Sequence, residues 1–237
     1  MSDNGVLTTI ITLSEVKNKQ YSFKAIDGSF YDLRTREGEV GYITLGIVKG
    51  RVIGQDFIID EILHEEKFCE KCNPEEEMRK MEYEEAMKSD DVDIVFMDRK
   101  LSFDKIPVPN NVIAIVKDPQ NVEDVEGKEP WLKEAYVIDG IRGAYFKLFN
   151  FSWVFLLETT SSLPWDEILS ILYTLGREPI PEALGYNYPL FLADKVAKYY
   201  RDKGSRVINI LKINASYRAF RSIIERNRKE VGRYNLF

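Results

Sequence analysis

The sequence predicts an α/β fold in which a mixed β-sheet is flanked by helices. Three apolar-rich runs, residues 21–33, 40–48 and 51–59, are joined by short turns that contain glycine. Runs of this kind are typical of an antiparallel meander. Two further runs, 93–98 and 111–116, are apolar without alternation. Strands of that kind are covered on both faces, as central parallel strands are, so we expect parallel and antiparallel pairs in one sheet.

Three helices are expected to flank this sheet. Asn73 and Pro74 suit the N-cap and the first helical position of a Glu-rich helix over residues 74–88. A second helix is expected over 165–175 and a third over 189–203. A meander, then a helix, then two buried parallel strands is the element order of a ribonuclease H-like α/β domain.

The remaining segments are assigned from composition and turn residues. Lys49 and Gly50 are expected to form the tight turn between the second and third strands. We predict a single domain over residues 1–237, because no internal repeat or low-complexity linker is present. The N-terminal arm (1–20) is expected to contain an apolar strand or amphipathic stretch at 6–13. A polar connector is expected at 119–134, followed by a β pair at 143–149 and 152–159. The C-terminal part (205–237) is expected to form a strand at 205–213 and a basic helix at 218–233.

The composition is that of an ordinary globular protein. Its 237 residues are 44% hydrophobic and 30% charged, with a formal net charge of −6. A protein that coats DNA regardless of sequence would be basic overall, so this charge argues against that class. It does not exclude a nuclease, because acidic residues gathered around metal ions lower the net charge. We expect no membrane span and no secretory signal, and therefore a cytoplasmic location, because the chain lacks the apolar runs that these need.

The two cysteines, Cys69 and Cys72, are spaced Cys-x-x-Cys. A zinc site would need further ligands, and His64 is the only histidine in the chain. A redox-active pair would need a βαβ context, which the surrounding pattern does not provide. We therefore expect either two free thiols or a disulfide of the kind found in hyperthermophile cytosols, placed in an exposed acidic loop.

Asp27 and Asp98 are the first candidates for chemistry. Asp27 follows the apolar Ala25 and Ile26 and precedes Gly28, so its carboxylate is expected near or under the surface. A buried carboxylate needs hydrogen bonds, a cation or a metal ion. In a ribonuclease H-like sheet the strands of Asp27 and Asp98 are neighbours, so the two acids could face each other across a pair of metal ions. The alternative is that the Asp-Gly pair only marks a turn.

A late segment, Gly185-Tyr186-Asn187-Tyr188-Pro189-Leu190-Phe191-Leu192-Ala193-Asp194, completes a pattern. With it, the chain from about residue 20 onward resembles the NurA family of DNA-end-resection nucleases. That family has a strand with Asp-Gly-Ser, a helix acid, a second strand Asp, a Lys after the next strand and Gly-Tyr-x-x-Pro-Leu-x-x-Ala-His. The matching residues here are Asp27, Glu82, Asp98, Lys117 and the segment 185–194. Two departures are Asp194 in place of the family's His, and Asp98 followed by Arg-Lys-Leu in place of a Gly and a small residue.

The resemblance implies a metal-dependent DNA nuclease that cleaves DNA ends or single strands during double-strand break repair. Two Mn²⁺ or Mg²⁺ ions would be held by carboxylates, which hard divalent ions prefer. The implied ligands are Asp27, Glu82, Asp98 and Asp194. Tyr186 is expected to position the phosphate or to pack in the core, and Lys117 to neutralise phosphate or to be an exposed strand-end lysine. Arg218 and Arg221, with Arg226 and Arg228, are expected to follow the DNA backbone or to be solvated.

The resemblance also implies a homodimer and a HerA-type hexameric ATPase as partner. Apolar residues near both ends, Val6 to Leu13 and the group Tyr234, Leu236 and Phe237, are typical of interfaces. Two alternatives remain: a catalytically inactive NurA-like subunit that docks to the ATPase, and a plain interaction module. If Asp27, Glu82 and Asp98 lie within metal-bridging reach of one another, a nuclease or its inactive relative is favoured; if they are scattered, the module is favoured.

Overall fold

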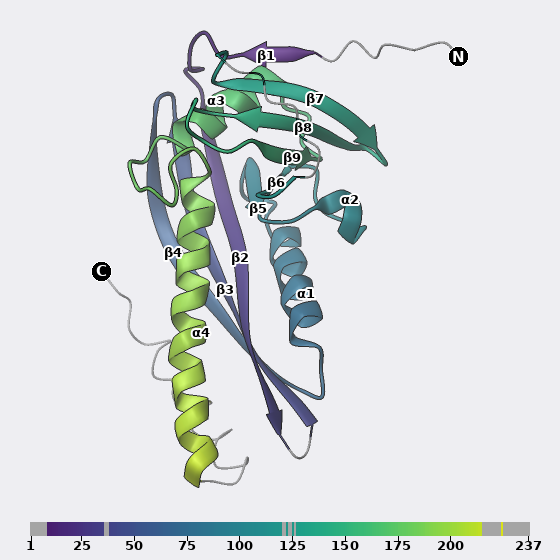
Figure 1. Ribbon diagram of the computed structural model, residues 1–237, viewed down its shortest axis with the longest axis vertical. Helices are drawn as coiled ribbons and strands as arrows, with labels where there is room; N and C mark the ends of the chain where they lie inside the picture. Colours follow the sequence, from purple (N-terminus) through teal and green to yellow (C-terminus); the bar gives the residue numbers. More distant parts are fainter. Residues whose placement is uncertain are drawn as a thin grey trace.

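The computed structural model describes residues 9–35, 38–119, 122, 125, 127–214 and 224. Within these residues one mixed sheet of nine strands has the order β1-β7-β8-β9-β6-β5-β2-β3-β4 (Figure 1). The strands are Ile10–Thr12 (β1), Gln20–Thr35 (β2), Gly38–Ile53 (β3), Asp56–Glu70 (β4), Ile94–Met97 (β5), Val112–Val116 (β6), Trp131–Ile138 (β7), Ile141–Lys147 (β8) and Phe155–Thr159 (β9). The helices are Pro74–Met87 (α1), Leu101–Asp104 (α2), Trp165–Leu175 (α3) and Tyr188–Asn214 (α4).

The three strands β2, β3 and β4 form the predicted antiparallel meander, but they are longer than predicted. The expected turn at Lys49 and Gly50 is wrong, because β3 continues through it to Ile53 with only a register shift between those two residues. Gly50 serves close backbone approach instead: a Cβ atom there would lie 2.2 Å from the carbonyl oxygen of Ile58. The chain turns at Gly54, whose φ of +58° is readily adopted by glycine.

The centre of the sheet confirms the predicted parallel pairing. β5 is parallel to β2, with Ile26 opposite Met97, and it is also parallel to β6. Asp27 and Asp98 directly follow this pair, so they lie side by side: Asp27 remains inside β2, and Asp98 comes just after β5 ends. The mixed α/β architecture with flanking helices is therefore confirmed.

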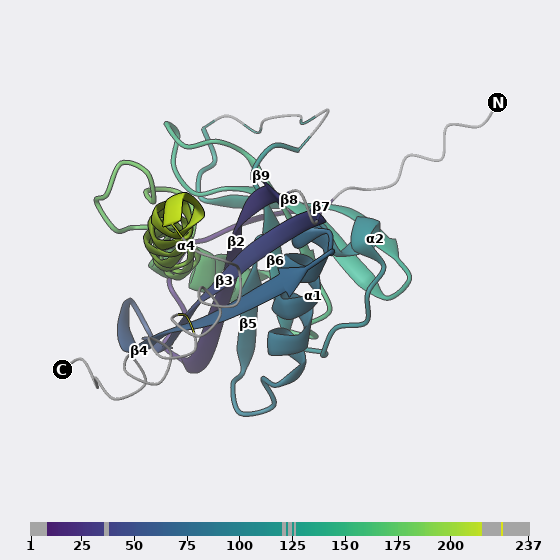
Figure 2. The same cartoon turned by 90° about the horizontal axis from the view of Figure 1, so that it is seen from below.

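The helices form a layer on each face of the sheet (Figure 2). Side chains alternate between the two faces along a strand. Phe23 and Ala25 of β2 belong to the core under α3 and the start of α4, whereas Ile26 belongs to the core under α1. The start of α1 is as predicted, since the side chain of Asn73 accepts hydrogen bonds from the N–H groups of the first turn. None of the helices in the described part of the chain is long and apolar enough to cross a membrane.

Two other sequence expectations are wrong. Residues 205–213 continue α4 as a helix, because Gly204 and Ile208, one turn apart, both pack on Tyr42 of the long β2–β3 hairpin. The expected connector at 119–134 ends in β7, whose first residue Trp131 is fully buried between β1 and β8. Residues 218–233 lie outside the described residues except for 224, and so do residues 6–8 of the N-terminal segment. The single-domain assignment stays a prediction.

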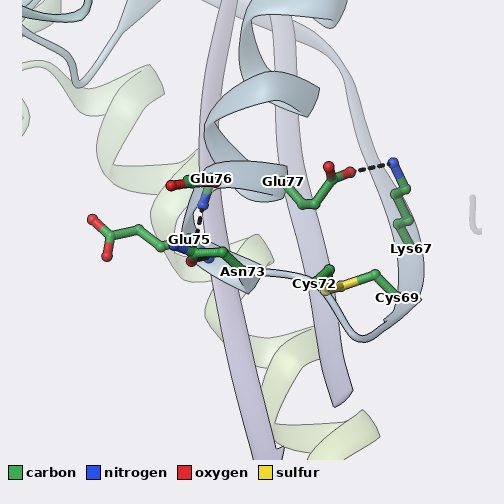
Figure 3. Close-up of a disulfide and its surroundings, with 7 residues drawn as sticks. All are labelled: Lys67, Cys69, Cys72, Asn73, Glu75, Glu76 and Glu77. Carbon is green, nitrogen blue, oxygen red and sulfur yellow. Dashed lines mark hydrogen bonds and ion pairs between the residues drawn. A yellow bond between two sulfur atoms is a disulfide. The ribbon is translucent and has the colours of Figure 1, made fainter. Parts of the chain in front are cut away.

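The Cys-x-x-Cys pair is a disulfide, one of the two expected outcomes. Figure 3 shows Cys69 and Cys72 joined where β4 ends and the chain turns toward α1. Beside it, Lys67 of β4 forms an ion pair with Glu77 of α1, with 2.7 Å between Nζ and Oε2. These contacts connect the outer strand of the sheet to the first turn of the helix that carries Glu82.

Candidate active site

Asp27 lies in the middle of β2 and, by strand alternation, faces α4. Its partner across the β2–β3 pair is Gly46. A Cβ atom at Gly46 would lie 2.0 Å from the carbonyl oxygen of Ala193, so only a glycine lets α4 approach β3 this closely. The hydroxyl of Thr44, on the same face of β3, donates to the carbonyl oxygen of Ala197 at 2.8 Å. Together these contacts place Asp194, the residue after Ala193, next to the strand of Asp27.

The Gly-Tyr-x-x-Pro segment is the lead-in to α4. Gly185 has a φ of +83°, a left-handed conformation that other residues rarely adopt. Asn187 accepts a hydrogen bond from the N–H of Leu190 at 3.0 Å, which caps the helix, and Pro189 stands in the first turn. The motif thus fixes where α4 begins and therefore where Tyr186 and Asp194 point.

Asp98 and Lys117 extend from two neighbouring parallel strands, β5 and β6. Their side chains form an ion pair with 2.5 Å between Nζ and Oδ2. The lysine side chain is 46% exposed, so it contacts Asp98 while remaining accessible from solvent. Lys117 is therefore a partly exposed strand-end lysine that lies at the acidic site, and its contact with phosphate stays a prediction.

Glu82 reaches the site from the opposite layer, on α1. It is only 2% exposed, and its carboxylate forms an ion pair with the guanidinium of Arg99. A Cβ atom at Gly28 would lie 2.5 Å from Glu82 Oε1, so the missing side chain of Gly28 makes room for this carboxylate. Burial raises the pKa of Glu82, and the hydrogen bond and charge of Arg99 oppose that rise.

Four carboxylates consequently influence one another around Asp27. Burial raises the pKa of Asp27 well above its ordinary value, and the negative charges of Asp98, Glu82 and Asp194 raise it further. The other three acids have cations within the chain: Arg99 for Glu82, Lys117 for Asp98 and Lys198 for Asp194. Among the described residues, no cation lies within ion-pair distance of Asp27, which accepts a hydrogen bond from the N–H of Gly28 at 2.8 Å.

Tyr186 is the neutral polar member of the cluster. It is 5% exposed, its ring is tilted against that of Phe155 with 5.4 Å between centroids, and the ammonium of Lys117 lies 4.8 Å from its ring centre. Its buried hydroxyl has no hydrogen-bond partner of acceptable geometry. Burial raises the pKa of Tyr186 well above its ordinary value, and the charges of Asp98, Asp27 and Asp194 add to this. The hydroxyl therefore lies beside the anionic cluster, with the carboxylate of Asp98 as the nearby acceptor, but not in good hydrogen-bond geometry.

The donor set suits a hard divalent cation, although the ligands are not arranged as a finished cage. Carboxylate oxygens and an unneutralised buried charge are what Mg²⁺ or Mn²⁺ would stabilise. In the described part of the chain, however, no three acidic, histidine or cysteine side chains are close enough together to hold an ion as they stand. Coordination would require Asp98 or Glu82 to exchange its Lys117 or Arg99 partner for a metal.

The structure therefore brings together Asp27, Glu82, Asp98, Lys117, Tyr186 and Asp194, the six predicted site residues that it describes. Arg218, Arg221, Arg226 and Arg228 lie outside the described residues. Sequence reasoning missed Arg99, whose pairing with Glu82 depends on the fold, and Lys198, which pairs with Asp194 at an i,i+4 spacing that the helical pattern offered. It also missed Gly46, for which a signal existed, because a glycine inside an apolar strand indicates close approach of another backbone.

Two solved structures share this fold. The NurA nuclease from Sulfolobus solfataricus matches with a TM-score of 0.59 and 15% sequence identity, over 89% of this chain and 89% of that one. The endonuclease V from Bacillus subtilis matches with a TM-score of 0.53 and 13% identity, over 83% of this chain and 88% of that one. At these identities the likeness concerns the fold alone, and this fold is that of a ribonuclease H-like α/β domain.

The family follows from the sequence itself. Residues 21–199 match the family model of the NurA domain, which is well over half of the chain. The chain belongs to the NurA family, as its motifs indicated. No curated protein matches it.

Proposed function

We propose that this protein is a metal-dependent deoxyribonuclease of the NurA type, which hydrolyses phosphodiester bonds at DNA ends or in single strands. The observation that carries the proposal is Asp27: a buried carboxylate without an ion-pair partner among the described residues, whose pKa is raised by burial and by the negative charges of Asp98, Glu82 and Asp194. A cluster with that charge is stabilised by a divalent cation and matches the needs of metal-assisted hydrolysis. Membership of the NurA family supports the choice of DNA as substrate.

Asp27, Asp98, Glu82 and Asp194 are the residues that would hold Mn²⁺ or Mg²⁺. When bound, such ions activate water and stabilise the charge on the leaving oxygen. Lys117 projects from the end of the central strand β6 with a partly exposed side chain, so its ammonium can neutralise a phosphate oxygen. The buried hydroxyl of Tyr186 makes no hydrogen bond of good geometry, so it can donate to a phosphate that enters the site in place of the nearby Asp98. Asp194 can serve as a ligand, but it cannot act as the neutral imidazole that histidine provides at pH 7.

A second function is favoured by one specific observation. Three of the four carboxylates already have internal cations, and Asp194 stands at the family's histidine position. A cluster neutralised in this way is what a catalytically inactive NurA-like subunit, retained for docking to a HerA-type ATPase, would contain. The electrostatic influence of Asp98, Glu82 and Asp194 on Asp27 argues against a plain interaction module, although among the described residues no three of these acids are placed to hold one ion as they stand.

Assembly is part of the proposal. We expect a cytoplasmic homodimer that acts with a HerA-type hexameric ATPase in double-strand break repair, as family membership suggests. Exposed apolar side chains on the outermost strand β4, Ile58 at 45% and Ile62 at 51%, support a protein interface on this edge of the sheet. Sedimentation of a monomer that does not change when the ATPase is added would contradict this part.

The activity is tested by a nuclease assay with Mn²⁺ on single-stranded and blunt duplex DNA, beside melting curves with and without the metal. The wild type should cleave, and Mn²⁺ should raise its Tm by mass action. Asp27→Asn should lose both effects. Asp32→Asn, an exposed acid on the same strand, is the matched control and should keep both.

Absence of cleavage by the wild type, together with an unchanged Tm in Mn²⁺, would contradict the nuclease and favour the inactive subunit. Cleavage that persists in Asp27→Asn would show that the acidic cluster is not the catalytic centre.

A further inference from the structure

The loop between β8 and β9 exposes two large aromatic side chains. Residues 148–154 read Leu-Phe-Asn-Phe-Ser-Trp-Val and contain no charged residue. Phe151 is 67% exposed and Trp153 is 82% exposed. The other two tryptophans of the chain, Trp131 and Trp165, are buried at 0% and 9% exposure. High tryptophan exposure is therefore specific to this loop. Large aromatic side chains exposed to solvent in this way usually mark a surface that binds a partner or ligand.

The loop is ordered by its own hydrogen bonds, so the aromatic side chains are held outward. The hydroxyl of Ser152 accepts from the N–H of Phe149 at 3.1 Å and donates to its carbonyl oxygen at 2.9 Å. The ring of Phe149 packs against Tyr173 of α3 and lies parallel to Phe151, with ring centroids 5.3 Å apart in the latter pair. One face of the Phe151 ring therefore stacks on Phe149, and the side chain remains 67% exposed.

This loop lies directly beside the candidate active site. A Cβ atom on Gly185 would lie 2.4 Å from the Cβ of Ser152, so the loop rests on the turn that precedes Tyr186. Trp153 is the next residue after Ser152, and Tyr186 is the next residue after Gly185. The contact between Ser152 and Gly185, plus one Cα–Cα step of about 3.8 Å on each side, therefore connects Trp153 to Tyr186. Phe155, at the end of the loop, contacts the ring of Tyr186, over which Lys117 lies.

We propose that Phe151 and Trp153 form a stacking platform for unpaired nucleobases, which leads a single DNA strand into the site beside Tyr186 and Lys117. This inference rests on the proposed nuclease function and specifies its substrate as DNA with an unpaired segment at or near the cut. Bases within a duplex stack on one another, and their faces become available to aromatic side chains only when the strand is unpaired.

The surroundings favour bases as the occupant over a protein partner. The uncharged loop leads through Phe155 and Tyr186 to the partly exposed ammonium of Lys117, so a strand stacked on the loop can place a phosphate at that cation in exchange for Asp98, a charge for which an apolar protein surface has no counterpart. A protein seated on this loop would also crowd the edge of the site that a phosphate must reach.

The test compares the wild type, Phe151→Ala/Trp153→Ala, Trp153→Phe and a control, Phe103→Ala. Phe103 is 75% exposed, but it lies on α2, whose buried residue Leu101 packs in the core on the α1 face of the sheet. Binding of a fluorescein-labelled oligo-dT and of a blunt duplex of equal length is measured in EDTA, and cleavage of both is measured in Mn²⁺.

Removing one stacked base contact weakens binding by about 5- to 150-fold, since stacking contributes about 1–3 kcal/mol per base. The double variant should therefore bind oligo-dT at least about tenfold more weakly and cleave it more slowly, with duplex binding little changed. Trp153→Phe keeps a ring and should stay close to the wild type, as should Phe103→Ala. Oligo-dT should also quench tryptophan fluorescence in the wild type, because Trp153 is the exposed tryptophan, and not in Trp153→Phe.

A double variant that binds and cleaves oligo-dT like a wild type that is itself active would overturn this inference and leave the nuclease intact. A wild type that neither binds nor cleaves DNA would overturn both. A double variant that changes its sedimentation coefficient without DNA would overturn the inference in favour of a protein interface at this loop.

Discussion

Substitution of Gly46 by alanine tests how the site is assembled. The new Cβ atom would lie 2.0 Å from the carbonyl oxygen of Ala193, 2.8 Å from its carbonyl carbon and 3.0 Å from the N of Ala197. All three are backbone atoms of α4, so no side-chain rotation can relieve the overlap. The helix must move away from β3 and take Asp194 with it.

The size of the effect follows from this geometry. The closest contact must open from 2.0 Å to at least 3.0 Å, a displacement of about 1 Å. Overpacking of this kind costs about 1–3 kcal/mol, which for a protein of this length lowers Tm by about 2–12 °C. Misplacement of a catalytic group by about 1 Å can lower the rate by about 100-fold. The stability loss should therefore be modest and the activity loss large.

Gly50→Ala is the matched control on the same strand. Its Cβ atom would lie 2.2 Å from the carbonyl oxygen of Ile58, a similar backbone overlap that involves β4 and not α4. Both variants should melt at lower temperature, but only Gly46→Ala should lose most of its Mn²⁺-dependent cleavage. Equal activity losses at equal stability losses would refute the claim that Gly46 positions Asp194.

Three further changes give distinct results. Asp27→Asn removes a buried charge whose pKa is raised, so in metal-free buffer at pH 7 it should raise Tm by several degrees; a lower Tm would contradict the repulsion inferred here. Glu167, whose pKa is lowered by hydrogen bonds from Lys19 and Tyr21, stabilises the fold above its ordinary pKa of about 4.3, and this stabilisation is lost as the pH falls through the lowered value. Glu167→Gln should therefore lower the free energy of unfolding by about 1 kcal/mol at pH 7 and by progressively less in acid, measured by urea unfolding. A loss of stability that does not change with pH would refute the lowered pKa of Glu167. Asp194→His restores the residue that the resemblance implies, and its cleavage rate should equal or exceed that of the wild type if Asp194 acts only as a ligand.

Much of the architecture was readable from local signals in the chain. The Asn73–Pro74 cap and the apolar runs at 93–98 and 111–116 act on residues close in sequence, and the elements lie where these signals put them. The neighbouring positions of Asp27 and Asp98 followed from the element order, because a helix between two strands favours a parallel crossover.

Tertiary contacts decided the rest. Gly50 looks the same in sequence whether it turns the chain or admits a neighbouring carbonyl group, and only pairing with β4 distinguishes the two. Helix α4 continues past residue 205 because the long β2–β3 hairpin offers Tyr42 to pack against. The cations of the site come from residues brought to the acids by folding, and Glu82 reaches the cluster only through the gap at Gly28. Caps and hydrophobic periodicity are properties of adjacent residues, whereas close approach and charge pairing depend on segments that meet only in the folded chain.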